Sequence, residues 1–159
     1  MAPNSMGVRL MGWSTTEPTL PIGSEWAQKD TIKISNSQLD VTSTLYFARL
    51  EDTGFALKLV EKRTFLTNSI FTYFYRTRYR CDVAGVTGTE YTETPFGNNG
   101  KTNTYYFTGN ADLGDTIYVL VSLNLDSSTG SSTFASPGVI VTITFDDQGG
   151  SACEAIICY

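Results

Sequence analysis

The chain has 159 residues and no histidine, with 11 Lys and Arg against 16 Asp and Glu, so its formal net charge is −5. This length suffices for one domain with a sizeable hydrophobic core. Phosphate binding requires grouped Lys and Arg, so the acidic balance argues against contact with nucleic acid through this segment. No apolar run reaches the roughly 18 residues of a membrane span, and we expect neither a span nor a signal peptide.

The amino-acid composition gives little support for a catalytic site. Without histidine, Ser-His-Asp, Cys-His and two-His metal sites are excluded. The carboxylates that remain for glycoside hydrolysis are Asp146 with Asp147, Glu51 with Asp52, Glu90 and Glu93. Strand neighbours point to opposite faces and carboxylates in turns are solvated, so none of these makes a convincing pair. We therefore expect a protein that is not an enzyme and that needs no cofactor.

The three cysteines are Cys81, Cys153 and Cys158, an odd number without the spacing of a zinc site. We expect reduced and mostly buried thiols. A single disulfide with one thiol left over is the alternative.

Residues 1–30 are expected to be an irregular lead segment, because prolines and glycines interrupt it repeatedly. The segment is too apolar for a free tail, and Trp13 and Trp26 stand out in it. We expect it to cover a sheet, a neighbouring copy or an adjoining domain. A short edge strand over Thr31 to Ser35 follows.

The clearest β pattern covers three successive strands, expected at 39–50, 55–66 and 70–81. The join at 51–54 predicts a hairpin in which Gly54 takes the left-handed conformation. In the second strand the residues expected to face the core alternate with polar ones: Phe55, Leu57, Leu59 and Phe65 against Lys58, Lys62 and Thr64.

The third strand has one aromatic and one cationic face. Arg76, Arg78 and Arg80 form a stripe for an anionic ligand, or pair with Asp and Glu of neighbouring strands, which we favour. The tyrosines that could stack on sugar rings are Tyr73, Tyr75, Tyr79, Tyr105 and Tyr106. We favour core or interface packing for them.

The second half of the chain predicts strands at 87–94, 102–108, 115–125 and 139–145, with a polar connector at 126–132 and a final strand or helical turn at 152–159. Possible loop contacts are Tyr91, Phe96, Asn98 and Asn99. Oxygen ligands at Asn110, Asp112 and Asp115 would suit Ca²⁺, but we favour a turn there and expect no metal site.

Short strands separated by turn signals predict one all-β domain over 1–159. The expected architecture is an antiparallel two-sheet sandwich of jelly-roll or immunoglobulin-like type.

The segment Thr44 to Phe55, T-L-Y-F-A-R-L-E-D-T-G-F, is similar to a hairpin of capsid protruding domains. Together with the short strands, the Thr- and Ser-rich surface and the absence of histidine, it makes the chain resemble coat or protruding domains of small non-enveloped RNA viruses. This resemblance implies a spike on the capsid surface that self-associates and contacts a host receptor or glycan, with RNA binding located elsewhere.

We expect a self-association interface at Trp13 and Trp26 or at Tyr73 and Tyr75, since acidic domains of this size rarely expose so many aromatic side chains without a partner. A fimbrial subunit or adhesin is an alternative, because Asp115 to Phe145 resembles the terminal strands of pilins. A carbohydrate-binding module is another, and both would place the chain outside the cell or at its surface.

Overall fold

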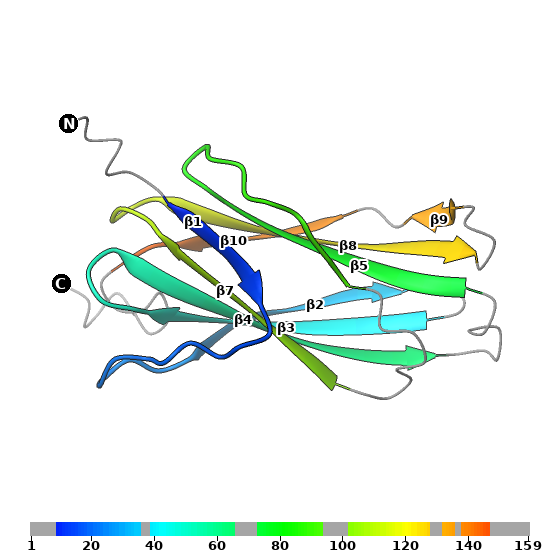
Figure 1. Ribbon diagram of the computed structural model, residues 1–159, viewed down its shortest axis with the longest axis horizontal. Coiled ribbons are helices and arrows are strands. Elements are labelled where there is room, and N and C mark those ends of the chain that lie inside the picture. The colour runs from blue at the N-terminus through cyan, green and yellow to red at the C-terminus, as the bar shows by residue number, and fades with distance from the viewer. Residues whose placement is uncertain are drawn as a thin grey trace.

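The computed structural model describes residues 9–35, 39–65, 73–93, 102–127, 132–135 and 138–146. These residues form ten strands in two antiparallel sheets that pack face to face (Figure 1). The described part of the chain contains no helix that could cross a membrane. The predicted all-β sandwich is therefore confirmed.

The first sheet has the strand order β1-β7-β4-β3-β2. Its strands are β1 (Leu10–Ser14), β7 (Thr102–Asn110), β4 (Gly54–Phe65), β3 (Leu39–Arg49) and β2 (Ala27–Ser35). The second sheet has the order β10-β8-β5-β6, with β9 paired to β8. Its strands are β10 (Val139–Thr144), β8 (Thr116–Ser127), β5 (Tyr73–Val83), β6 (Tyr91–Glu93) and β9 (Ser132–Ala135).

The strand order resembles one of the two predicted arrangements. In the first sheet β3, β4 and β7 are neighbours, and in the second β10, β8, β5 and β6 follow one another. Immunoglobulin-like sandwiches place strands A, B and E in one sheet and G, F, C and C′ in the other. The chain crosses between the sheets at equivalent points, after β4, β6 and β7, so the likeness is to that arrangement.

The core is formed by strands whose side chains alternate between the two faces. In β4, Leu57 and Leu59 are buried while Lys62 is exposed, and in β8 Val119 is buried while Tyr118 is exposed. Burying one face of each strand removes apolar surface from water at about 25 cal/mol per Å². The alternation predicted for the strand at 55–66 is therefore confirmed for the residues whose side chains are described, and β8 follows the same pattern.

The lead segment is less irregular than expected. β1 pairs with β7, and β2 begins at Ala27, four residues before the predicted strand. Gly12 lies in β1 with φ 118°, at a shift of register between Leu10 and Gly12. Glycine accommodates such a bulge at no steric cost, so here it bends a strand instead of ending it.

The hairpin between β3 and β4 is present, but its left-handed residue is Asp52, with φ 56°, and not Gly54. Gly54 begins β4. A Cβ atom on Gly54 would lie 3.0 Å from the Leu50 Cβ and 3.1 Å from the Glu51 carbonyl oxygen. Glycine is needed here for close packing and not for an unusual φ.

Other boundaries also differ from the prediction. The strand expected over 87–94 is limited to β6, and β8 and β9 take up both ends of the expected connector over 126–132. Cys153, Cys158 and the expected element over 152–159 lie outside the described residues.

A tight turn follows β5. Val83 and Val86 exchange two backbone hydrogen bonds of 3.0 and 2.8 Å, and the residues between them, Ala84 and Gly85, have φ of 50° and 83°. Positive φ at both central positions defines a type I′ turn, which favours Asn-Gly. Ala84 therefore occupies a conformation that its Cβ disfavours.

We predict that Ala84→Asn raises the free energy of unfolding by about 0.5–1 kcal/mol, because asparagine tolerates the left-handed conformation better than alanine. Urea denaturation would measure the change. Ala84→Val is the matched control and should lower stability, since a β-branched side chain fits this φ poorly. Equal stability of the two variants would contradict the strain at this turn.

Candidate binding site

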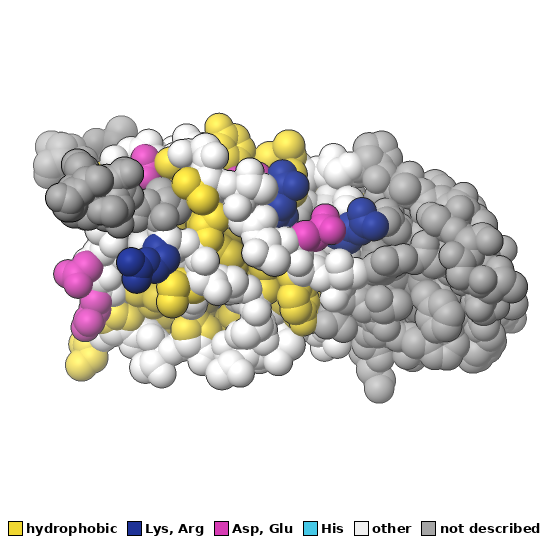
Figure 2. Space-filling model, turned by 45° about the horizontal axis from the view of Figure 1, so that its top comes forward, with side chains coloured by type: hydrophobic (Ala, Val, Ile, Leu, Met, Phe, Trp, Pro, Cys, Tyr) yellow, Lys and Arg dark blue, Asp and Glu magenta, His cyan; other side chains and the backbone are white. Residues whose placement is uncertain are grey.

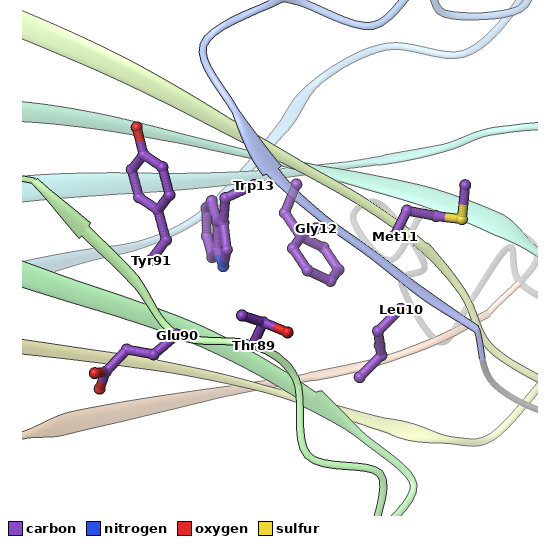
Figure 3. Close-up of a pocket in the computed structure, with 8 residues that line it drawn as sticks. Leu10, Met11, Gly12, Trp13, Thr89, Glu90 and Tyr91 are labelled. Atoms are coloured by element: carbon purple, nitrogen blue, oxygen red, sulfur yellow. The ribbon is translucent and has the colours of Figure 1, made fainter.

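An open pocket of about 280 Å³ lies between β1 of the first sheet and the chain around β6 of the second (Figure 3). It is lined by Leu10, Met11, Gly12, Trp13, Phe107, Thr89, Glu90 and Tyr91. Both β1 and β6 lie at an end of the strand order of their sheets. Figure 2 shows one face of the molecule, on which hydrophobic side chains form a band with charged side chains beside it.

The pocket has aromatic walls. The Trp13 ring centroid lies 5.2 Å from that of Phe107, 5.6 Å from Tyr79 and 6.5 Å from Tyr91. Met11 is 63% exposed beside them. The pocket therefore offers a ligand both flat aromatic surface and a flexible apolar side chain.

The polar groups of the pocket are few. The Trp13 Nε1 atom is covered from solvent, and no described residue accepts its hydrogen bond. A buried donor without an acceptor costs roughly 1–3 kcal/mol. The Glu90 carboxylate is half-exposed and lies 3.9 Å from the Arg78 guanidinium, while Thr89 is exposed.

Asp82 holds the wall that carries Thr89 and Glu90. Its carboxylate accepts two 3.0 Å hydrogen bonds from Arg80 and one of 2.9 Å from the Gly88 backbone N–H. A Cβ atom on Gly88 would lie 2.1 Å from the Cys81 carbonyl oxygen. The absence of a side chain at Gly88 thus lets this segment lie directly on β5.

The predicted arginine stripe lies on the outer face of β5. Arg80 pairs with Asp82 of the same strand, and Arg78 with Glu90, which directly precedes β6. The Arg76 side chain is outside the described set. Arg78 and Arg80 thus each lie beside a carboxylate, Asp82 within β5 and Glu90 outside it.

The two predicted interface tryptophans lie on opposite faces of the first sheet. Trp13 packs toward the core on Phe107, whereas Trp26 packs 6.0 Å from Tyr106, the adjacent residue on the opposite face of β7. Trp26 donates a 3.3 Å hydrogen bond to Glu17. The side chains of Tyr73 and Tyr75 lie outside the described part, and the interface stays a prediction.

Of the other candidate sugar platforms, Tyr79 and Tyr105 are buried between the sheets. Among the loop contacts, Tyr91 lines the pocket, and Phe96, Asn98 and Asn99 fall within 94–101, which the structure does not describe.

The oxygen cluster proposed for Ca²⁺ is arranged as a turn. The Asp112 backbone N–H donates 2.8 Å to the Asp115 carboxylate, and the Asp115 N–H donates 3.0 Å to the Asp112 carbonyl. The Asn110 side chain accepts a hydrogen bond from Thr53. In the described ranges, His, Cys, Asp and Glu form no group of three able to hold a metal.

Arg49 makes a group of contacts at one end of the sandwich, near Asp146. Arg49 at the end of β3 donates 2.6 Å to the Asp146 carbonyl, and its guanidinium lies 4.3 Å from the ring centroid of Phe145. It also donates to the Asp52 carbonyl of the β3–β4 turn.

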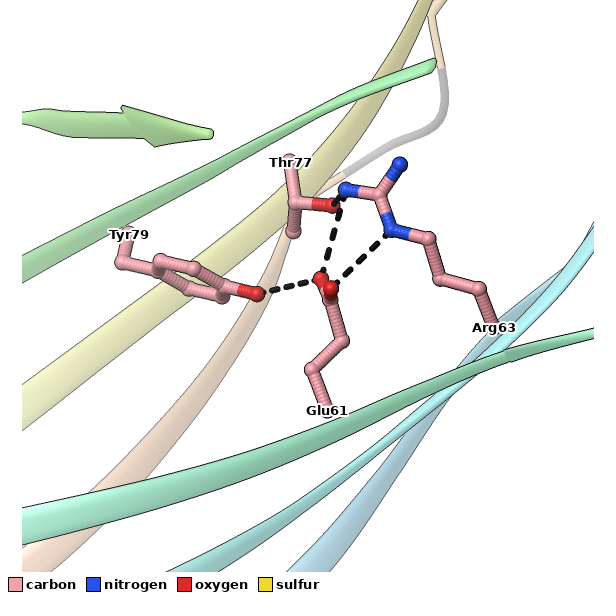
Figure 4. Close-up of polar contacts among 4 residues, drawn as sticks. All are labelled: Glu61, Arg63, Thr77 and Tyr79. Carbon is pink, nitrogen blue, oxygen red and sulfur yellow. Dashed lines mark hydrogen bonds and ion pairs between the residues drawn. The ribbon is translucent and has the colours of Figure 1, made fainter. Parts of the chain in front are cut away.

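Sequence reasoning missed a fully buried polar cluster between the two sheets (Figure 4). Arg63 Nε donates 3.0 Å to Glu61, Arg63 also donates to the Thr77 hydroxyl, and the Tyr79 hydroxyl donates to Glu61. All four residues have no exposed surface. The cluster joins β4 to β5, and its burial gives it a structural role.

The signal for this cluster was present in the strand alternation. Glu61 and Arg63 occupy odd positions of β4, on the face of Leu57 and Leu59. Period-2 alternation places them inside, although charged residues are rarely buried unless paired.

Burial raises the pKa of Tyr79 well above 10, and the adjacent Glu61 carboxylate raises it further. Burial also raises the pKa of the Cys81 thiol, with a smaller contribution from Asp82. Both groups are therefore held neutral, and Cys81 lacks the thiolate that reactive cysteines need.

No protein family model matches this sequence, and no curated protein matches it either.

We predict that Glu61→Gln lowers the free energy of unfolding by about 3–5 kcal/mol, because it leaves the Arg63 charge buried without its counter-charge. Lys62→Gln, at the exposed neighbour, is the matched control and should change stability by less than about 0.5 kcal/mol. Chemical denaturation of both variants gives the comparison, and equal effects would contradict the role of the cluster.

Alkaline pH should destabilise the protein partly through Tyr79. Because the pKa of Tyr79 is higher in the folded than in the unfolded protein, its protonated hydroxyl contributes fully to the free energy of unfolding below the unfolded-state pKa near 10. Above that pH the contribution is lost, by up to about 1.4 kcal/mol per pH unit. Unfolding measured between pH 8 and 11 should show a shallower loss for Tyr79→Phe than for the wild type. If Tyr79→Phe keeps the wild-type slope, the assignment fails.

Proposed function

We propose that this chain is a non-enzymatic structural and recognition domain that assembles with copies of itself on a virion surface. The observation that carries the proposal is a patch on the outer face of the second sheet, where Ile140 is 58% and Tyr118 40% exposed. Leu120 lies directly opposite Ile140 in the pairing of β8 with β10. We call these three residues the outer apolar patch.

The neighbouring strand edge supports self-association. β10 consists of six β-branched residues without charge or proline, and in the described part of the chain it pairs with β8 alone. Exposed edges are usually protected by lysine, proline or a bulge, because an unprotected edge accepts a further strand. Antiparallel pairing of β10 with its equivalent in a second copy is two-fold symmetric and needs no other complementary surface.

Charge also favours this surface. The chain carries a formal charge of −5, so two copies repel one another at long range. Contact through β10 and the outer apolar patch opposes no like charges, because all their residues are uncharged. The virion setting is supported by the resemblance of the Thr44–Phe55 hairpin to capsid protruding domains.

A carbohydrate-binding module is a second candidate, and the aromatic pocket between β1 and β6 favours it. The two candidates differ in what they require: the first needs self-association, and the second only a ligand. If the chain is a virion-surface domain, the same pocket would serve host attachment.

Light scattering on the size-separated protein tests the proposal. We predict a mass of at least twice the 17.4 kDa of one chain, reduced to one chain by Ile140→Lys. A buried lysine without a partner disfavours the interface. Thr31→Lys, in the edge strand of the first sheet, is the matched control and should leave the assembly intact.

A monomeric wild type at high concentration would overturn the self-association. Ile140→Lys without effect, or Thr31→Lys with the same effect, would overturn its assignment to β10. Negative-stain microscopy of the same fractions should show closed shells or discrete symmetric particles, and open filaments would contradict the virion role in favour of a fimbrial one.

A further inference from the structure

We infer that the pocket between β1 and β6 binds one ring of a neutral sugar. This names a ligand class for the recognition role proposed above, and it does not depend on self-association. The size of the pocket, its aromatic walls and the hydrogen-bonding groups of Trp13 and Glu90 support this assignment.

Size limits the occupant to a small group. About 280 Å³ is slightly below the roughly 300–1,000 Å³ of typical small-molecule sites. The pocket is open to solvent, and Thr89 and Glu90 at its mouth are exposed. It therefore suits a single ring whose remaining substituents stay outside, such as the terminal residue of a glycan.

The apolar lining matches one face of such a ring. Trp13 and Tyr91 are stacked at 29°, and Phe107 and Leu10 complete the wall. The C–H groups on one face of a pyranose pack against aromatic rings, while its hydroxyls point outward to polar partners. Gly12 leaves open space on the β1 side, since a Cβ atom there would meet nothing within 4 Å.

Trp13 distinguishes between ligand chemistries. In Figure 3 its indole nitrogen lies at the end of the ring that faces Thr89. This N–H has no acceptor among the described residues and is covered from solvent, so a ligand must displace a neighbouring side chain slightly to reach it. Thr89, which the indole nitrogen faces, is exposed, so its side chain can rotate while the Gly88–Asp82 hydrogen bond holds the backbone beside it.

The occupant must therefore accept a hydrogen bond, which an alkylammonium ion cannot do. At the mouth, the Glu90 carboxylate and the Arg78 guanidinium lie 3.9 Å apart and together carry no net charge. Glu90 would repel a carboxylate ligand, whereas a ring with several hydroxyls can accept from the indole with one of them and donate to Glu90 with another. A ring with several hydroxyls meets all these requirements.

NMR of the full chain tests this inference, because its two tryptophans give two indole N–H signals. The probes are the methyl glycosides of glucose, galactose and mannose, with fucose and N-acetylglucosamine. We expect at least one to shift the Trp13 signal saturably at millimolar concentration while the Trp26 signal stays in place. The same titration is carried out on the Ile140→Lys protein, so a negative result here is separate from the outcome for self-association.

Two variants identify the contacts. Glu90→Gln, at an exposed position, should weaken binding about fivefold or more by replacing a charged acceptor. Trp13→Phe keeps an aromatic ring but removes the donor and should weaken binding at least as much, followed through the Gly12 backbone amide. Trp26→Phe is the matched control and should bind like the wild type.

The inference is overturned if no probe shifts the Trp13 signal at about 100 mM, an upper limit for weak specific binding. It is also overturned if both Glu90→Gln and Trp13→Phe bind like the wild type. Sodium acetate or methylammonium chloride producing the same saturable shift would assign the pocket to a charged ligand instead.

Discussion

The buried ion pair of Glu61 and Arg63 constrains how the two sheets meet. Two charges without solvent contact must find their partners inside the protein, and here β5 supplies them through Thr77 and Tyr79. A slip of β4 by one residue would expose the pair and bury Lys62 in its place. The need to pair Glu61 and Arg63 therefore fixes the position of β4 against β5, which apolar packing alone would determine less well.

Tyr79 links this constraint to the surface. Its hydroxyl donates to Glu61, while its ring lies 5.6 Å from Trp13 and 6.4 Å from Tyr91. The aromatic walls of the pocket thus rest on a side chain that the ion pair holds in place. Binding sites built on rigid strands require less ordering when a ligand arrives, and this arrangement provides that rigidity.

Much of the fold was predictable because it follows from local patterns. The alternation in β4 identified its core face, and the Asp52–Gly54 region identified the hairpin. Glu61 and Arg63 were missed because their charge argued for exposure while their position argued for burial. The pocket could not be predicted, since it depends on the pairing of β1 with β7, about 95 residues later in the chain, for which no local signal exists.

The contacts of Arg49 can form only late in the synthesis of the chain. Its contacts join the β3–β4 turn to Phe145 and Asp146, nearly 100 residues further on. On the ribosome the early hairpin must wait for these residues before that end of the sandwich can close, and until then its apolar face is exposed. Such late closure makes the nascent chain a candidate for chaperone binding, and faster translation would shorten the time for which its apolar face is exposed.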